Sequence, residues 1–356
     1  MFVSWQGKTV KKSFGKVSST APITSLKDPI IADARRRLAA APADSGACFL
    51  ADGAKMVRQA IQAGADIQTL FFLDPIEQDE DRQALDLARQ ANLPCHLLKP
   101  GIFFKVLDLG YRTSVGCLAV VARPPSAPLD DLPPDACLLA GQSIQDPRNV
   151  GVLIRTADAW AARTLFSADS ADPWSRPAVR STTGSIFRAP VTLSADLGGE
   201  LRRLRDRGVA IIGSSARSRR AVWELDLRGP VVLLVGNETA GLPADLLDLC
   251  DQAARIPMTG SAHSFNVTVA AGILLYECQR QRSSSGTCRP AGRFLPETHL
   301  PQAGSGPMAE KRLRSESQTG MSALQAVFAA TIQADKPALH YGSESQTRMS
   351  AVPAAP

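Results

Sequence analysis

The chain has 356 residues, a formal net charge of +6, and 44% hydrophobic and 21% charged residues. This length leaves room for two domains and further segments. No apolar run approaches the roughly 20 residues that a membrane-spanning helix needs, so we expect no membrane partner.

The positive charge is concentrated at the two ends. Residues 1–27 contain five Lys and no acid, and residues 282–356 contain eight basic and five acidic residues. Such ends suit either loose attraction to phosphate backbones or simple solubility. The N-terminus lacks the apolar core of a secretory signal, so we expect a cytoplasmic protein, with an organellar transit peptide as the alternative.

Seven cysteines are present, and none forms a CxxC pair. Most have apolar neighbours, which is typical of reduced thiols in a core. We therefore expect neither a disulfide framework nor a zinc site, and no metal of any kind.

Residues 1–25 predict a basic flexible end, and residues 26–123 predict a small α/β domain. Amphipathic periodicity predicts helices over 29–41, 52–64 and 79–91. Short apolar runs predict strands at 48–51, 69–73, 95–98 and 114–122. Five prolines within residues 124–134 are incompatible with a regular element, so residues 124–135 are predicted to be a linker.

A second domain is predicted over residues 136–281. Apolar runs at 137–140, 164–166, 209–212 and 231–235 alternate with helical patterns after Asn149 and over 197–207, 243–249 and 267–277. Continuous apolar strands indicate a parallel sheet covered on both faces. Such sheets bind ligands at the carboxyl ends of their strands, where polar clusters stand in this chain.

The absence of lysine limits the chemistry of the second domain. No lysine occurs between Lys105 and Lys311, so Schiff-base mechanisms and a P-loop are excluded from this domain.

Residues 282–356 are predicted to be disordered, apart from one weak helix over 323–334. The segment SESQTGMSA at 315–323 recurs there as SESQTRMSA at 343–351, but two copies are too few for a solenoid.

The first polar cluster runs from Gln145 to Ala159. Asp146 and Pro147 predict a turn, Asn149 is predicted to cap the following helix, and Gly151 allows close backbone approach. Arg155 lies within an apolar helical run, where a charge needs a partner or a function. The alternative is an arginine that reaches the surface.

Two further clusters follow. A predicted strand runs into Gly236, Asn237 and Glu238, where a ligand could lie against the backbone; the alternative is a tight strand-to-helix turn. The third cluster, Ile256–Glu277, is a polar loop that enters an apolar helix. Ser264 and Asn266 can cap this helix, and the small residues 270–272 allow close packing; alone, it could equally be a capped core helix.

The three clusters, in this order, resemble the three motifs of the SpoU/TrmH family of RNA ribose 2′-O-methyltransferases. The resemblance covers about residues 136–281 and rests on NVGVLIRTA from Asn149, VGNETAGL from Val235 and IPMTGSAHSFNVTVAAGILLYE from Ile256. It implies a knotted fold of the SPOUT superfamily, with a parallel sheet and a C-terminal trefoil knot. Residues 26–123 look, more loosely, like the α/β RNA-binding domain that often precedes it.

The resemblance also implies a cofactor, a substrate and roles for individual residues. The cofactor would be S-adenosyl-L-methionine, and the partners would be RNA, with ribosomal RNA favoured over tRNA, and a second copy of the chain in a homodimer. The residues implied to contact the cofactor are Leu234, Gly236, Asn237, Ile256, Met258, Ser264 and Phe265. The implied catalytic residues are Asn149, Arg155, Glu238, Ser264 and Asn266.

Two roles and the class of protein stay open. Arg155 is either the base or, because a guanidinium is essentially never neutral, a charged group that stabilises the forming alkoxide. His263 either contributes to catalysis or fills a loop. Thr239, Phe265, Thr268 and Trp160-Ala161 depart from the family pattern, and Thr239 affects only the turn after Glu238. The alternatives are a tRNA 2′-O-methyltransferase, a knotted base methyltransferase, and a non-catalytic knotted RNA-binding or ribosome-assembly factor.

Overall fold

A computed structural model describes residues 21–40, 46–106, 115–261 and 263–284. These residues all belong to one unit. The predictions for residues 1–20 and 285–356, including the weak helix and the repeated segment, lie outside the described residues. No helix among the described residues is long and apolar enough to cross a membrane.

The first part of the chain forms a four-stranded mixed sheet with helices on both faces. Its elements are α1 (Pro29–Ala39), β1 (Cys48–Asp52), α2 (Ala54–Gln62), β2 (Ile67–Leu73), α3 (Asp79–Gln90), β3 (Cys95–Leu98), α4 (Pro100–Val106) and β4 (Cys117–Ala122). The strand order is β1-β4-β2-β3, in which β2 and β3 are parallel and the other pairs antiparallel.

The predicted helices and strands of this part are confirmed, apart from the positions of some of their ends and one additional helix. Helix α4 was not predicted, because its seven residues are too few to show a helical period. Helix α2 begins at Ala54 because Asp52 still belongs to β1 and pairs with Leu118. Residues 107–114 are outside the described residues, and the strand predicted from Ser114 begins at Cys117.

The proline-rich segment before the second part contains no helix or strand, as predicted, but it is packed against its neighbours. Leu129 is buried, and its carbonyl accepts a hydrogen bond from Arg207 Nη1 at 2.6 Å. Thr192 Oγ1 donates to the Ala127 carbonyl at 2.7 Å. A segment without regular structure is thus held in place by side chains of the second part.

The second part is a six-stranded sheet in which every pairing is parallel. Its elements are β5 (Cys137–Gly141), α5 (Pro147–Ala159), β6 (Arg163–Ser167), α6 (Arg176–Thr182), η1 (Ser185–Phe187), β7 (Val191–Ser194), α7 (Leu197–Asp206), β8 (Ala210–Ser214), η2 (Val222–Glu224), β9 (Val231–Val235), α8 (Ala244–Leu249), β10 (Gln252–Ala254) and α9 (Val267–Ser284). The strand order is β10-β8-β9-β5-β6-β7.

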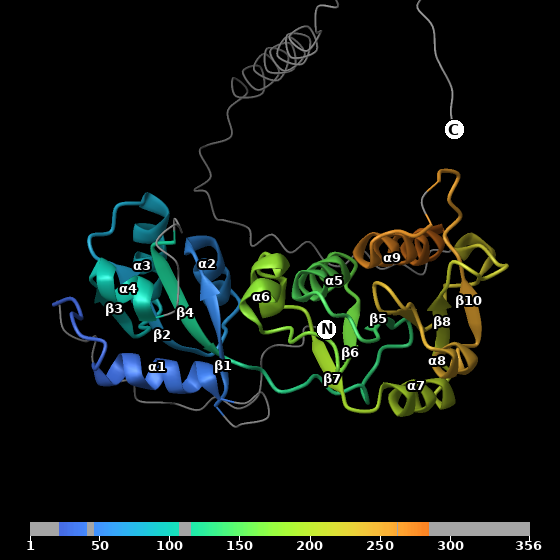
Figure 1. The fold of residues 1–356 in the computed structure, drawn as a ribbon, viewed down its shortest axis with the longest axis horizontal. Coiled ribbons are helices and arrows are strands. Elements are labelled where there is room, and N and C mark those ends of the chain that lie inside the picture. The colour runs from blue at the N-terminus through green and yellow to red at the C-terminus, as the bar shows by residue number, and fades with distance from the viewer. Residues whose placement is uncertain (1–20, 41–45, 107–114, 262, 285–356) are drawn as a thin grey trace, which may run out of the picture. The chain divides into compact units, whose positions relative to one another are not determined.

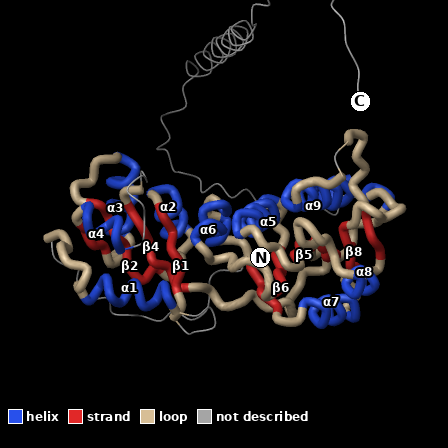
Figure 2. Tube along the Cα trace, viewed as in Figure 1, coloured by secondary structure: helices blue, strands red, loops and turns tan. Residues whose placement is uncertain are grey.

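Both faces of this sheet are buried, as the continuous apolar strands predict. Leu139 and Leu233 join the core on the side of α5 and α9, whereas Leu138 and Leu234 join the core on the side of α7 and α8. The two groups of helices lie on opposite sides of the strands (Figures 1 and 2). The predicted α/β class with a parallel sheet is confirmed, and the threading of a knot stays a prediction.

Helix α6 packs closely on α5 through Gly151. A Cβ atom at Gly151 would lie 2.2 Å from the Ala178 carbonyl oxygen and 2.7 Å from Ser181 Cβ, so the predicted close approach is present. By contrast, a Cβ at Gly272 would lie 3.8 Å from Thr156 Cγ2, which is an ordinary contact. Close packing of α9 therefore does not require a glycine at position 272.

Helix α9 continues past Glu277, where the apolar pattern ends, to Ser284. Arg282 is buried and donates to the carbonyls of Asp135 at 2.7 Å and Gly229 at 2.6 Å. These hydrogen bonds connect the end of α9 to the segments that precede β5 and β9. The apolar pattern predicts an end at Glu277, because an arginine in a sequence usually indicates an exposed position and Arg282 is buried.

Cysteines among the described residues are unbonded, and Cys48, Cys117 and Cys278 are buried. Burial raises the pKa of Cys95 and of Cys250 to about 11, which keeps both as thiols at neutral pH. Cys137 Sγ lies 3.9 Å from Cys278 Sγ, so this pair joins β5 to α9 by contact. Cys288 lies outside the described residues.

Candidate functional site

The sheet topology brings the first two polar clusters together. Strands β5 and β9 are neighbours, with Gly141 opposite Val235 at their carboxyl ends. The segments that leave these two ends are residues 142–149 and 236–243, so residues almost a hundred positions apart become adjacent. This is the point at which strand order changes direction along the chain, where parallel sheets commonly bind ligands.

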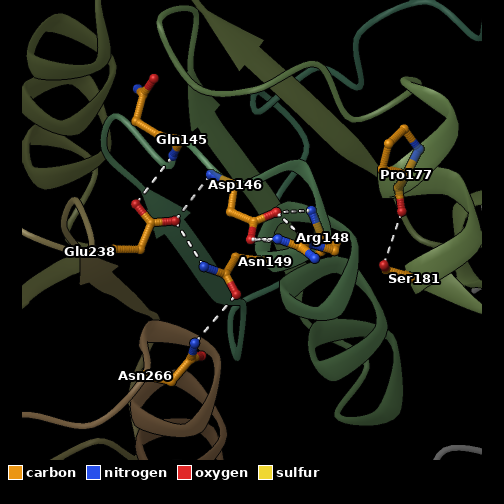
Figure 3. A network of polar contacts seen from close by, with 8 residues as sticks. All are labelled: Gln145, Asp146, Arg148, Asn149, Pro177, Ser181, Glu238 and Asn266. Atoms are coloured by element: carbon orange, nitrogen blue, oxygen red, sulfur yellow. Dashed lines mark hydrogen bonds and ion pairs between the residues drawn. The ribbon is translucent and has the colours of Figure 1, made fainter.

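Glu238 is the centre of a hydrogen-bond network at this edge (Figure 3). Its carboxylate accepts hydrogen bonds from Asn149 Nδ2 at 2.9 Å and from the backbone N–H groups of Gln145 at 3.2 Å and Asp146 at 3.3 Å. Burial acts to raise the pKa of Glu238, but these three hydrogen bonds, together with its own backbone N–H, outweigh it and hold the pKa below its ordinary value. The carboxylate is therefore ionised at neutral pH.

Asn149 lies between the second and third clusters (Figure 3). While its Nδ2 donates to Glu238, its Oδ1 accepts from Asn266 Nδ2 at a long 3.5 Å. The prediction that Asn149 caps α5 is wrong. Asp146 is the N-cap, because its carboxylate accepts from the Arg148 N–H at 2.8 Å and Pro147 occupies the first helical position. The Asn149 side chain is thus free to face the site.

Asn237 and Gly236 shape the turn that presents Glu238. Asn237 Oδ1 accepts from the N–H groups of Thr239 and Ala240, both at 2.9 Å, and its Nδ2 donates to the Ser143 carbonyl at 2.8 Å. A Cβ atom at Gly236 would lie 2.3 Å from the Gly241 carbonyl carbon. The close approach at Gly236 is therefore made by the protein's own backbone at Gly241.

Asn266 caps helix α9, as predicted. Its Oδ1 accepts from the Thr268 N–H at 2.8 Å and from Thr268 Oγ1 at 2.6 Å. Ser264 and His263 precede it on the same loop with exposed side chains. Neither side chain reaches the Glu238 network, so the structure gathers Asn149, Glu238 and Asn266 and leaves Ser264 beside them in sequence only.

Arg155 stands apart from this network. Its side chain is exposed and makes no hydrogen bond or ion pair with the residues that the structure describes. Along α5 it is six residues, or about 9 Å of helix, beyond Asn149. A guanidinium that is exposed and unpaired remains available for an anionic partner.

The residues implied to hold the cofactor divide by accessibility. Leu234 is fully buried in the core on the side of α7 and α8, and its backbone pairs with Ala140 and Gly213 inside the sheet, so its side chain is not accessible to a ligand. Ile256 and Met258 are half-buried on the loop after β10, and Phe265 is 41% exposed on the same loop. Apolar side chains that remain accessible beside free backbone groups suit a flat heterocycle such as a purine.

Four polar residues that support the site were not predicted. Ser143 has a positive φ of 51°, an unusual conformation for a non-glycine residue. Its N–H donates to Ser167 Oγ at 2.8 Å, its Oγ donates to Asp169, and the Ile144 N–H donates to Ser170 Oγ at 3.1 Å. These contacts fix the backbone that presents the Gln145 and Asp146 N–H groups. The polar run directly after the apolar strand at 164–166 was the available signal.

Metal-ligand clusters are not found among the described residues: no group of three or more His, Cys, Asp or Glu side chains there could hold an ion.

Comparison with known proteins gives matches over this part of the chain. Residues 137–276 match the model of the SpoU rRNA Methylase family. The 23S rRNA (uridine(2479)-2′-O)-methyltransferase of Streptomyces viridochromogenes is 32% identical over 248 residues, covering 67% of this chain and 85% of the relative. The 23S rRNA (guanosine-2′-O-)-methyltransferase RlmB of Pseudomonas aeruginosa is 35% identical over 147 residues, covering 41% of this chain and 59% of the relative.

Solved structures agree with these relatives. The SpoU methyltransferase AviRb from Streptomyces viridochromogenes, in complex with the cofactor AdoMet, has a TM-score of 0.62 and 28% identity. The similarity covers 72% of this chain and 100% of that one, so it includes the N-terminal part as well as the parallel sheet.

Proposed function

We propose that this chain, which belongs to the SpoU rRNA Methylase family, transfers a methyl group from S-adenosyl-L-methionine to a ribose 2′-hydroxyl of ribosomal RNA. The observation that carries the proposal is the Asn149–Glu238–Asn266 network, because it joins all three sequence motifs at one edge of the sheet. Two relatives of this chain are named as 23S rRNA 2′-O-methyltransferases.

The cofactor would be held by the loop after β10 and the turn after β9. Ile256, Met258 and Phe265 offer apolar contact to the adenine, and backbone groups near Gly236, beyond the end of β9, offer hydrogen bonds. When bound, S-adenosyl-L-methionine supplies an electrophilic methyl group. The protein contributes by holding the ribose hydroxyl in position, which accounts for much of the rate in such reactions.

Each polar residue then has a separate task. Glu238 holds Asn149 in one orientation, and Asn149 orients the ribose through its amide. Arg155 stays charged, contacts the RNA phosphate and stabilises the negative charge that develops on the 2′-oxygen as its proton leaves to solvent. We prefer this role to that of a base because a guanidinium does not lose its proton in proteins.

Three finer statements belong to the same proposal. The chain acts on ribosomal RNA in preference to tRNA, it works in the cytoplasm, and it forms a homodimer. Support for the dimer comes from α9, where Val269 and Tyr276 are 47% and 56% exposed despite being apolar and aromatic. Exposed apolar faces of this kind usually mark contact with another protein.

The test measures methylation of an unmodified 23S rRNA transcript together with cofactor binding by calorimetry. Arg155→Ala should lower kcat by roughly 10²- to 10³-fold, because the charge that stabilises the developing negative charge on the 2′-oxygen is lost. Cofactor affinity should be unchanged. The matched control is Arg202→Ala, which removes an equally exposed arginine from α7 on the other side of the sheet.

The outcomes separate the alternatives. Near-normal turnover in Arg155→Ala would show that this residue has no catalytic role. A methyl group found on a base by mass spectrometry of nucleosides would identify a base methyltransferase. Methylation of tRNA in place of the transcript would identify the tRNA enzyme, and a wild-type protein without cofactor binding would be a non-catalytic RNA-binding factor.

A further inference from the structure

A group of arginines surrounds the end of β10, at the same sheet edge as the proposed catalytic network. Residues 215–223, after β8, and residues 252–266, around β10, contain four arginines and no acidic residue. These are Arg217, Arg219, Arg220 and Arg255, and all four are exposed. Together with Trp223 we call them the arginine patch.

Backbone contacts join the two segments into one surface. The Val222 N–H donates to the Arg255 carbonyl at 2.9 Å, and the Arg255 N–H donates to the Arg220 carbonyl at 2.9 Å. Ser218 Oγ also donates to the Ala253 carbonyl at 2.7 Å. The segment after β8 therefore lies against the end of β10, and both can be followed at the edge of the sheet in Figure 1.

Most of the charge on this surface is uncompensated. The guanidinium groups of Arg217, Arg219 and Arg255 make no hydrogen bond or ion pair with any described residue. Arg220 differs, because it donates to Gln252 and to the Glu224 carbonyl and so braces the loop. Three unpaired arginines on two adjoining loops create a positive potential that attracts phosphate groups.

Trp223 adds an aromatic face to the charge. Its side chain is 57% exposed, although the neighbouring Val222 and Leu225 are buried and anchor the short helix η2. An exposed tryptophan beside unpaired arginines is the combination with which proteins bind single-stranded nucleic acid, since arginines contact phosphates and the ring stacks on a base.

We propose that the arginine patch binds a single-stranded segment of the substrate RNA beside the target nucleotide, with Trp223 stacked on one unpaired base. Arg255 directly precedes Ile256, so the patch continues into the loop assigned to the cofactor, and RNA bound there reaches the reacting methyl group. The inference rests on the proposed function, because it assumes an RNA substrate. It assigns this contact to the methyltransferase part of the chain, separately from the N-terminal part.

The test uses the full-length protein and two probes. One is a fluorescein-labelled single-stranded RNA of 20 nucleotides, whose affinity is measured at several salt concentrations. The other is an unmodified 23S rRNA transcript, with which kcat and KM are measured. The variants are Arg217→Ala/Arg219→Ala, Trp223→Ala and Trp223→Phe. The control is Arg202→Ala/Arg203→Ala on α7, which removes the same charge elsewhere.

The double variant should bind the 20-mer more weakly, and its plot of log affinity against log salt should be shallower by about 1.4, because two phosphate contacts are lost. Trp223→Ala should weaken binding roughly tenfold, and Trp223→Phe should restore most of it. KM for the transcript should rise while kcat at saturating RNA, cofactor affinity and melting temperature stay unchanged, since all these side chains are exposed.

The proposed function and this inference fail differently. If the wild-type protein methylates the transcript but the patch variants match it in affinity, salt slope and KM, the patch does not bind RNA. If the wild-type protein methylates no RNA but the patch variants bind the 20-mer more weakly than it does, the patch binds RNA and the proposed function is wrong. If the α7 control loses as much affinity for the 20-mer as the patch variant does, the effect comes from net charge alone. The proposal of a specific RNA-binding surface would then be wrong.

Discussion

At the scale of single residues, the carboxylate of Glu238 connects the motifs. It holds two backbone N–H groups of one segment and the side chain of Asn149, and through Asn149 it reaches Asn266. Hydrogen bonds to an ionised acceptor are stronger than those to a neutral one. The orientation of Asn149 should therefore depend on whether Glu238 carries its charge.

This dependence predicts an effect of pH. In the folded protein the pKa of Glu238 lies below its ordinary value, so its stabilisation is present above the ordinary glutamate range and is lost as pH falls through the folded pKa. Glu238→Gln should reduce the free energy of unfolding at pH 7 by about 1 kcal/mol, a value reduced for solvent exposure.

Urea unfolding at pH 7 and near pH 4 checks this prediction. The stability difference between the wild-type protein and Glu238→Gln should shrink at the lower pH, and it should vanish only below the folded pKa of Glu238, where the wild-type carboxyl is protonated. Glu200→Gln on α7 is the control, because Glu200 pairs with Arg203 on the helix surface. A difference between wild type and variant that is the same at both pH values would contradict the argument.

The polar residues of the motifs could be identified from sequence, but their partners could not. Asn149, Glu238 and Asn266 stood out as polar groups at strand and helix ends, and the structure brings them into one network. Ser143 and Asp169 escaped notice because their role is to hold backbone, and such a role depends on a contact between residues 26 positions apart. Arg155 remained ambiguous in sequence, and its exposed position explains why.

At the scale of elements, the contact between α5 and α6 depends on the absence of a side chain at Gly151. Adding a Cβ there would force it against the Ala178 carbonyl oxygen, which belongs to backbone and has no rotamer to change. Gly151→Ala should therefore lower the free energy of unfolding by about 1–3 kcal/mol, despite the better helix propensity of alanine. Activity should fall as well, because α5 carries Asn149 and Arg155.

Gly272→Ala in α9 is the matched control. There a Cβ meets only Thr156 Cγ2, at an ordinary contact distance, so the variant should be neutral or more stable by up to about 1 kcal/mol. Thermal unfolding of both variants and of the wild-type protein measures these changes in stability. Equal effects of the two substitutions would contradict the argument that the α5–α6 contact leaves no room for a side chain at position 151.

Elements with a strong period were predictable, and short ones were not. The sequence predicts the buried strand Val231–Val235 with its observed ends, because five consecutive apolar residues are typical of a strand that is covered on both faces. Strands β7 and β10 have four and three residues and mixed polarity, and they form because neighbouring strands offer them hydrogen bonds. Helix α9 extends beyond its apolar pattern because the buried guanidinium of Arg282 donates hydrogen bonds to carbonyls of segments distant in sequence.

At the scale of the whole molecule, the parallel sheet followed from the alternation of strands and helices, but the strand order did not. That β9 lies beside β5 is a result of tertiary pairing across ninety residues, and the adjacency of the first two motifs depends on it. The resemblance to a family supplied that arrangement where periodicity could not. It also supplied the expectation of a homodimer, which the exposed face of α9 supports.

The dimer is the prediction that belongs to this scale. Val269, Ile273 and Tyr276 have the spacing of one helix face, and the ring of Trp160, directly after α5, lies 6.2 Å from that of Tyr276. A face formed by two neighbouring helices can pair with its own copy about a twofold axis. Light scattering at micromolar concentration should therefore give the mass of a dimer for the wild-type protein.

Val269→Asp/Tyr276→Asp should shift that mass to the monomer, because each substitution would bury a carboxylate in the interface. Trp223→Ala is the control: it removes a side chain that is equally exposed but lies outside this face, and it should leave the mass unchanged. A wild-type monomer, or a double variant that stays dimeric, would place the contact elsewhere. A monomeric variant that still methylates RNA at the wild-type rate would mean that each site is complete within one chain.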